Sequence, residues 1–407
     1  MSIFPTKVDF VSYIKKRKSE GQYVYFREID ACSGPTVHVD GKRVVMVGSN
    51  DYLGLACDER VREAAVAAMC RWGTGPSGSR FLCGNMGVIS ELEEAVADLV
   101  GKKKALVHTT GFMANSGTFP CLVDQGDLVL CDRESHASIF EGVSRTKGKM
   151  YTFRHNDVES ARKKIAKFDK ENSDKGRVLV TEGVFSMSGS VADLPNLVAL
   201  KKEYPGLQVF LDDAHGLGVM GKGRGTAAHF GVTGEIDVMM GTFSKAFASV
   251  GGFIASDDTD WLEFLKHRSR TLMFSAALPP ASAAAALESC RIIAEEPERV
   301  ERLWANTAKA RAGFKECGVP VLEAEGPVIA VMVGDETLAC ELSLKLLDRG
   351  VFVLPAEYPA VAPGKAILRV AFTSAHEDHH IDEVLNIFAE VMGEVSGEFA
   401  AVAGYAC

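Results

Sequence analysis

The central part of the chain alternates between short apolar runs and longer amphipathic segments. Residues 58–72 and 88–100 carry apolar positions at helical spacing, which predicts helices there. Most of the apolar runs between them do not alternate with polar residues, which is typical of parallel strands buried on both faces. Strands are expected at 105–107, 128–130, 178–180, 209–211, 238–240 and 253–254. Their spacing leaves room for crossover helices, so a doubly wound α/β domain is predicted.

The two ends of the chain have a different pattern. Residues 1–20 have helical spacing, and residues 22–49 fit a hairpin around the turn at 40–42. Helices are also expected over 281–294 and 297–317, followed by strands at 327–332 and 366–370 on either side of another helix. The expected division has four parts: an N-terminal helix and hairpin arm (1–48), a large domain (49–288), a small C-terminal α+β domain (289–395) and a tail (396–407).

Composition narrows the class of protein. The 407 residues are 47% hydrophobic, enough for a large core, and the net charge of −9 argues against a broad nucleic-acid surface. No apolar run reaches the roughly 18 residues that a membrane span needs. The N-terminus lacks the layout of a signal peptide, so a cytoplasmic protein is expected. The ten cysteines form no Cys-x-x-Cys pair, which favours reduced thiols over a metal site.

Lys245 follows a predicted buried strand and lies among small and hydroxyl residues. Burial lowers the pKa of a lysine and frees its amine as a nucleophile, as in lysines that form Schiff bases. The hydroxyls of Thr242 and Ser244 could bind a phosphate beside it. The motif alone fits equally well a structural lysine that extends from a strand end into solvent.

Asp212 and His215 stand at the end of another predicted strand. A pyridinium ring needs a buried carboxylate partner to remain protonated, and Asp212 is suited to that role, with His215 near the ring hydroxyl. An acidic magnesium motif would need a phosphate-binding Gly-rich loop upstream, and the nearest match, 216–223, lies downstream. A metal site at Asp212, Asp213 and His215 is a weaker alternative.

Three further strand ends carry candidate groups. Gly111 opens a predicted helix, whose first N–H groups could hold a phosphate. His136 could stack on a planar ring or simply occupy a helix-capping turn, and 181–189 brings further hydroxyl groups to the same edge. The Gly-x-Gly-x-x-Gly sequence at 73–78 follows a predicted helix rather than a strand, which argues against a dinucleotide site.

Together, these motifs resemble the α-oxoamine synthases, which are fold-type I pyridoxal-phosphate (PLP) enzymes. The resemblance runs from about residue 20 to 393 and is carried by the segments 49–55, 78–80, 135–139, 212–215, 241–245 and 278–280. It implies an α/β fold with a large domain built on a mostly parallel seven-stranded sheet and a smaller C-terminal α+β domain. The implied activity is the condensation of a small amino acid with an acyl-CoA, usually with decarboxylation, in a homodimer. The serine palmitoyltransferase and glycine acetyltransferase branches are favoured.

The resemblance also assigns roles to residues. Lys245 would hold PLP as a Schiff base and transfer a proton, Asp212 would pair with the ring nitrogen, and His136 would stack on the ring. His215 and Ser186 would contact the ring oxygen. Asn50 and Arg369 would hold the substrate carboxylate. The expected phosphate contacts are Gly111, Phe112, Thr242, Ser244 and, from the partner subunit, Ser275.

The chain departs from the family pattern near the acyl-CoA side. Asn85 and Ile89 stand where the family usually has threonine and histidine. This departure raises the hypothesis of an unusual acyl donor, such as a carrier-protein thioester. Two other functions remain open: a different fold-type I enzyme such as an aminotransferase, and a non-catalytic partner subunit. Such subunits typically lack the Schiff-base lysine, whereas Lys245 is present.

Overall fold

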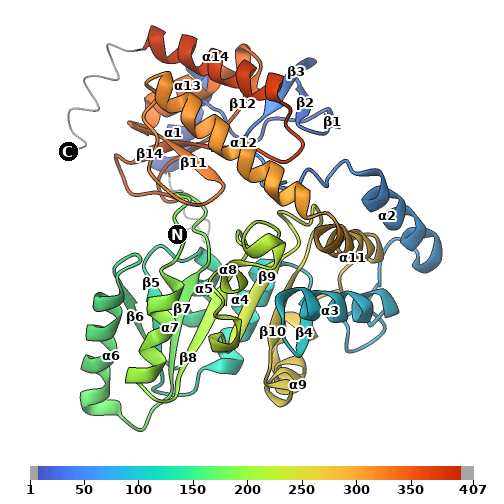
Figure 1. Ribbon diagram of the computed structural model, residues 1–407, viewed down its shortest axis with the longest axis vertical. Helices are drawn as coiled ribbons and strands as arrows, with labels where there is room; N and C mark the ends of the chain where they lie inside the picture. Colours follow the sequence, from blue (N-terminus) through green and yellow to red (C-terminus); the bar gives the residue numbers. More distant parts are fainter. Residues whose placement is uncertain (1–7, 396–407) are drawn as a thin grey trace. The chain divides into compact units, whose positions relative to one another are not determined.

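The computed structural model describes residues 8–395, which form two compact units (Figure 1). The large unit comprises 50–304 and 325–327, and the small unit comprises the described parts of 1–49, 305–324 and 328–407. The N-terminal arm therefore belongs to the small unit. The division falls after residue 304, inside a helix, whereas the sequence pattern placed it at 288. The expected tail at 396–407 lies outside the described residues.

The large unit is built on a seven-stranded sheet in the order β4-β10-β9-β8-β7-β5-β6. Its strands are β4 (Lys104–His108), β5 (Leu128–Asp132), β6 (Lys149–Phe153), β7 (Arg177–Glu182), β8 (Leu207–Asp212), β9 (Val238–Thr242) and β10 (Gly252–Ser256). Only β10 runs against its neighbours within this sheet. The predicted mostly parallel seven-stranded sheet is confirmed, and β6 is the strand that the apolar pattern missed.

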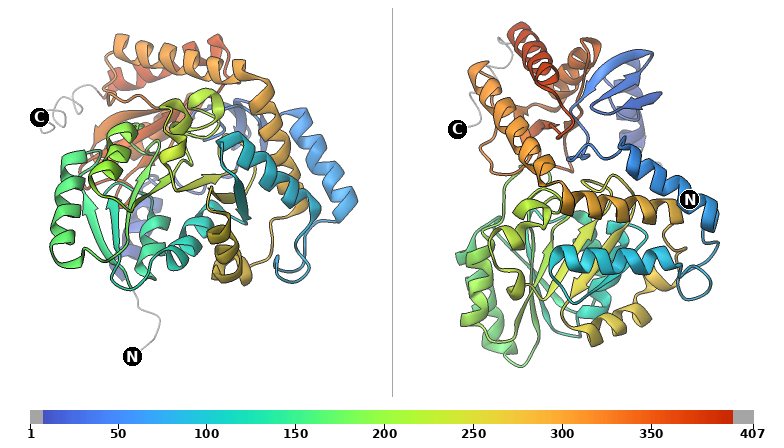
Figure 2. Two further views of the ribbon diagram at one scale, coloured as in Figure 1. Left: turned by 60° about the horizontal axis from the view of Figure 1, so that its bottom comes forward. Right: turned by 45° about the vertical axis from the view of Figure 1, so that its right-hand side comes forward.

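Helices cover both faces of this sheet (Figure 2). One face packs against apolar residues of α4 (Gly111–Leu122), α5 (Ala137–Ser144) and α9 (Thr259–Arg268). On the opposite face, Phe168 of α6 (Val158–Asn172) makes an edge contact with Tyr151 of β6. Because successive side chains of a strand point to opposite faces, both faces of the sheet are buried, which explains its apolar strands.

The remaining helices of the large unit complete the covering layers. They are α2 (Glu59–Trp72), α3 (Gly87–Val100), α7 (Leu194–Glu203), α8 (Thr226–His229), α10 (Arg270–Met273) and α11 (Pro280–Glu295), with short 3-10 turns at Gly221–Gly223 and Thr233–Glu235. The helix α2 directly precedes Gly73, so the Gly-x-Gly-x-x-Gly sequence follows a helix as expected. No helix among residues 8–395 is long and apolar enough to cross a membrane.

The small unit contains two short sheets and its own core. One sheet has the order β1-β2-β3-β12 and the other β11-β14-β13. Apolar side chains of β3, β11, β12, β14 and the adjoining helices form one buried cluster, and Val37, Val39, Val44 and Phe352 form a second, smaller one. Its strands are β1 (Ala31–Ser33), β2 (Thr36–Val39), β3 (Lys42–Met46), β11 (Val328–Gly334), β12 (Val351–Phe352), β13 (Pro355–Ala356) and β14 (Ala366–Ala371). Its helices are α1 (Val8–Ser19), α13 (Glu336–Asp348) and α14 (Asp378–Glu394), and α12 (Pro297–Glu316) contributes its residues from 305 onward.

Candidate active site

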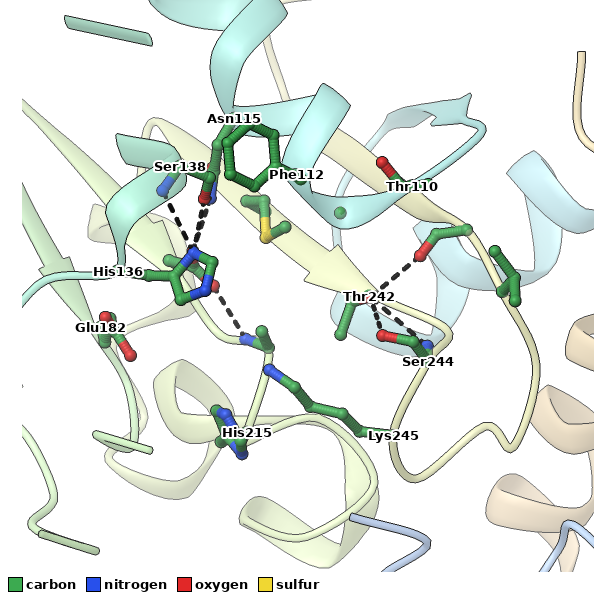
Figure 3. Close-up of a pocket in the computed structure, with 16 residues that line it drawn as sticks. Thr110, Phe112, Asn115, His136, Ser138, Glu182, His215, Thr242, Ser244 and Lys245 are labelled. Atoms are coloured by element: carbon green, nitrogen blue, oxygen red, sulfur yellow. Dashed lines mark hydrogen bonds between the residues drawn. The ribbon is translucent and has the colours of Figure 1, made fainter. Parts of the chain in front are cut away.

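A cavity of about 320 Å³ lies at one edge of the large sheet (Figure 3). The strands β4, β5, β7, β8 and β9 all end at this edge, and the antiparallel β10 begins there. Ligands of open α/β sheets typically bind at the carboxyl ends of the strands. Eight predicted site residues line the cavity: Gly111, Phe112, His136, Asp212, His215, Thr242, Ser244 and Lys245.

Lys245 stands three residues beyond the end of β9 and is half-buried. Its side chain extends across the cavity toward the end of β8, where His215 lies (Figure 3). Thr242 and Ser244 place their hydroxyl oxygens 2.9 Å apart on the other side of the lysine backbone. The turn after β9 therefore places the amine of Lys245 on one side and the hydroxyls of Thr242 and Ser244 on the other.

The N-terminus of α4 forms the wall next to these hydroxyls. Thr110 caps the helix by accepting a hydrogen bond from the N–H of Met113, at 3.1 Å. A Cβ at Gly111 would lie 2.9 Å from the Thr242 Oγ1 atom, so only glycine allows the helix to approach β9 this closely. The first backbone N–H groups of α4, the positive end of its dipole and two hydroxyls together suit a phosphate group.

Asp212, at the end of β8, is almost completely buried. Its Oδ2 accepts a hydrogen bond of 2.7 Å from the Nδ2 of Asn115, and its Oδ1 accepts one of 3.1 Å from the N–H of Ala214. These donors orient the carboxylate in the cavity wall. A buried, oriented carboxylate can pair with a cationic ring nitrogen.

Tyr52 connects His215 and Asn50. The hydroxyl of Tyr52, which is fully buried, lies 2.7 Å from the Nδ1 of His215 and 3.5 Å from the Oδ1 of Asn50. Tyr52 therefore helps to orient the imidazole of His215. The sequence pattern did not single out Tyr52, because an aromatic residue in an apolar stretch is ordinarily part of the core.

His136 lies at the rim of the cavity and is also the N-cap of α5. Its Nδ1 lies 2.7 Å from the Ser138 hydroxyl and 3.2 Å from the N–H of the same residue. The ring is edge-on to Phe112, with centroids 6.4 Å apart. Burial lowers the pKa of His136, Asp212 opposes that shift and the Lys245 charge adds to it. His136 therefore occupies a helix-capping turn and also lines the cavity, while its stacking on a planar ring remains a prediction.

Glu182, the last residue of β7, also lines the cavity and was not predicted as a site residue. Burial raises its pKa well above the usual range, and repulsion by Asp212 adds to this, while Lys245 and the N–H of His136 act in the opposite direction. A raised pKa in a cleft is a recognised mark of functional sites. No group of three acidic, histidine or cysteine side chains in 8–395 could hold a metal ion, and the cysteines there are free thiols.

Four other predicted residues do not line the cavity: Asn50, described above, Ser186, Ser275 and Arg369. Ser186 lies beyond Glu182 in the loop after β7, and Ser275 is half-exposed in the segment before α11. Arg369 belongs to the small unit, where it pairs with Ala330 in the register of β14 with β11. The roles of these residues remain predictions.

The two positions that depart from the family pattern have structural partners. The Oδ1 of Asn85 accepts hydrogen bonds from the Nε and Nη2 of Arg80, at 2.9 and 2.8 Å. Arg80 also forms an ion pair with Glu93 of α3. Ile89 is fully buried on the same helix. Asn85 therefore anchors the loop before α3, and Ile89 belongs to the apolar core.

Comparison with known proteins agrees with this geometry. Residues 42–388 match the family model described as aminotransferase class I and II. A serine palmitoyltransferase of Sphingobacterium spiritivorum is 39% identical over 393 residues, covering 96% of this chain and 97% of that protein. An 8-amino-7-oxononanoate synthase of Petrotoga mobilis is 39% identical over 379 residues, covering 93% of this chain and 96% of that protein.

A solved structure shows the same fold. It is a serine palmitoyltransferase from S. paucimobilis with bound PLP and myriocin, and it is 32% identical to this chain. The match covers 97% of this chain and 100% of that chain, with a TM-score of 0.93. The chain therefore belongs to the aminotransferase class I and II family and, within it, to the α-oxoamine synthases.

Proposed function

We propose that this chain binds PLP through Lys245 and condenses L-serine with a long-chain acyl-CoA. The products would be an α-aminoketone, carbon dioxide and free CoA. The observation that carries the proposal is that Lys245, Asp212 and His136 line the same cavity. The chain is also similar to serine palmitoyltransferases over nearly its full length. The choice of serine rests on those relatives, because other α-oxoamine synthases are also similar to the chain.

The residues of the cavity fit PLP at both ends. Gly111, Thr242 and Ser244 form the cradle described above, which a Cβ at Gly111 would fill. At the other end, Asp212 is oriented to accept a hydrogen bond from a protonated ring nitrogen. The Oδ1 of Asn115 is buried beside it with no hydrogen-bond partner among the described residues, which leaves an acceptor for a bound group.

When bound, PLP would supply an electron sink for the bonds at the substrate Cα. Asp212 would keep the ring nitrogen protonated, which strengthens that sink, and His136 would cover one face of the ring. Lys245 would hold PLP covalently in the resting enzyme. After the substrate amine displaces it, the freed amine of Lys245 would remove the Cα proton and serve as general base.

The remaining predicted residues complete this proposal. Arg369 would bind the substrate carboxylate in the bidentate manner that guanidinium groups favour, together with Asn50. A homodimer in which Ser275 reaches the partner's phosphate, and a cytoplasmic location, are proposed on the family resemblance alone. The similarity to these relatives does not distinguish an acyl-CoA from an acyl-carrier donor, so the choice of donor is part of the test.

The test uses the PLP-loaded chain with serine, glycine or alanine and with matched palmitoyl-CoA and palmitoyl-carrier donors. Release of the donor thiol and of carbon dioxide is measured together. Equal release of both with serine and palmitoyl-CoA is expected. Transfer of the amino group to a keto acid without thiol release would indicate an aminotransferase and overturn the proposal. A tenfold or greater preference for the carrier-bound donor would support the hypothesis that the substitutions at Asn85 and Ile89 accompany a change of acyl donor.

A further inference from the structure

A chain of hydrogen bonds connects the buried carboxylate of Asp212 to the ring of His136. The Nδ2 of Asn115 lies 2.7 Å from the Oδ2 of Asp212 and 2.9 Å from the Oγ of Ser138. The Oγ of Ser138 in turn lies 2.7 Å from the Nδ1 of His136. Asn115 is fully buried and Ser138 nearly so. The three links bring residues of α4, α5, β8 and the β5–α5 loop together (Figure 3).

The first link fixes the orientation of the Asn115 amide. An ionised carboxylate can only accept hydrogen bonds, so the atom facing Asp212 must be the nitrogen. The NH₂ group has two hydrogens, and its two neighbours at hydrogen-bond distance are Asp212 and Ser138. The Ser138 oxygen therefore accepts a hydrogen bond from Asn115.

The remaining links fix the tautomer of His136. Because the Ser138 oxygen already accepts from Asn115, its own proton is available for the Nδ1 of His136, at 2.7 Å. The N–H of Ser138 points at the same nitrogen through the helix cap, at 3.2 Å. A ring nitrogen that accepts from two donors carries no proton, so the proton of a neutral imidazole must be on Nε2.

We propose that Asn115 and Ser138 are positioning residues that hold His136 as the neutral tautomer protonated on Nε2. The ring then offers an N–H donor to the substrate and cannot act as the general base of the reaction. The tautomer follows from the geometry alone, whereas the contact with substrate rests on the proposed function. The charged or titratable groups that face the ring are Asp212, Lys245 and Glu182, from the ends of β8, β9 and β7.

The burial-driven lowering of the His136 pKa agrees with a neutral ring at physiological pH. A donor at Nε2 would suit an anionic or carbonyl oxygen of the substrate. A proton on Nδ1 would instead face the backbone N–H of Ser138, which cannot turn away. That arrangement would break the helix cap as well as the ring contact.

The direct test is nitrogen NMR of the PLP-loaded full chain carrying ring-¹⁵N histidine, with the His136 signals identified by their loss in His136→Gln. Between pH 6.5 and 8, His136 is expected to show an unprotonated Nδ1 and a protonated Nε2. A protonated Nδ1 or a cationic ring in this range would overturn the proposal. This reading requires no catalytic turnover, so it stands or fails separately from the acyl-transfer reaction.

Ser138→Ala and Ser138→Thr form the variant pair that tests the chain itself. Alanine removes the hydroxyl donor, so His136 is expected to become a mixture of tautomers, and the KM for the amino acid is expected to rise about fivefold. Threonine keeps the hydroxyl and is expected to restore both readings. Unchanged tautomer and KM in Ser138→Ala would show that the backbone N–H acts alone and would overturn the role of the chain.

Ser144→Ala is the matched control. Ser144 is exposed on the same helix, and its hydroxyl donates to the backbone oxygen of Glu141. This variant is expected to leave the His136 signals and the KM unchanged. If Ser138→Ala fails to fold, the wild-type NMR reading by itself still supports or overturns the assigned tautomer.

Discussion

His136 and His155 follow the ends of adjacent strands, β5 and β6, at the same edge of the same sheet. The pKa values of their rings are nevertheless shifted in opposite directions. The Nδ1 of His136 faces the hydroxyl and N–H donors of Ser138. The Nδ1 of His155 lies 3.1 Å from the carboxylate of Asp132, which is fully buried. Both histidines therefore follow a strand end, but the Nδ1 of His136 faces donors and the Nδ1 of His155 faces an acceptor.

The pKa values follow the partners. Burial lowers the pKa of both rings. For His155, the hydrogen bond to Asp132 and its charge outweigh burial, and the pKa is raised. Asp132 also accepts from the N–H groups of Asn156 and Glu134, both at 2.9 Å, and the Nε2 of His155 lies 2.9 Å from the Ser190 hydroxyl. This network joins loops, whereas His136 lines the cavity, so one histidine is structural and the other is proposed to act on substrate.

The largest expected effect on turnover comes from replacing Lys245, which lines the same cavity as His136. Lys245→Ala is expected to abolish covalent PLP binding and to lower turnover by roughly 10³-fold or more. Visible absorption of bound PLP and thiol release measure the two effects. Because Lys245 is only half-buried, the thermal midpoint should change little. More than a tenth of wild-type turnover in the variant would contradict the role of Lys245.

Asp132→Asn tests the structural role of the network around His155. It places an amide where a buried carboxylate accepts two backbone N–H groups and faces His155. The expected loss is about 3 kcal/mol of unfolding free energy, measured by urea denaturation. Turnover per folded, PLP-loaded molecule should remain within about threefold of wild type. A loss of turnover without a loss of stability would place this network in the reaction.

The pair His136→Gln and His155→Gln compares the two rings directly. His136→Gln is expected to lower turnover by about 10²-fold with little change in stability. His155→Gln should leave turnover within about threefold and lower the unfolding free energy by about 1 kcal/mol. Equal losses of turnover in both variants would remove the distinction between the two histidines.

The smallest expected effect is the pH dependence of the His155 contribution. A histidine whose pKa is raised by folding stabilises the protein fully below its unfolded pKa of about 6.5. This contribution is lost as the pH rises through the folded value. The difference in unfolding free energy between wild type and His155→Gln should therefore be larger at pH 5.5 than at pH 8.5. A difference that grows with pH would contradict the assignment.

The apolar pattern predicted six of the seven strands of the large sheet and missed β6. Three of the five side chains of this edge strand, Lys149, Met150 and Thr152, are exposed. An edge strand with one partner and little burial has no continuous apolar run. The division into two compact units falls after residue 304, within α12, where the helical pattern continues and no sequence signal marks a boundary.

For the site, the sequence could identify groups at strand ends but not the residues that orient them. Lys245, Asp212 and His136 are recognisable because reactive side chains directly follow apolar strands. Asn115 and Ser138 lie inside helices, where small polar residues are common and carry no distinctive spacing. Their function depends on the packing of α4 against α5 and β8, which no local pattern encodes.

Covalent attachment of PLP to Lys245 can be measured by reducing the PLP-loaded protein with borohydride, followed by digestion and mass spectrometry. We expect one phosphopyridoxyl group per chain, on the peptide that contains Lys245. The same group on any other lysine, or no covalently bound group in a protein that carries PLP, would rule out this role of Lys245.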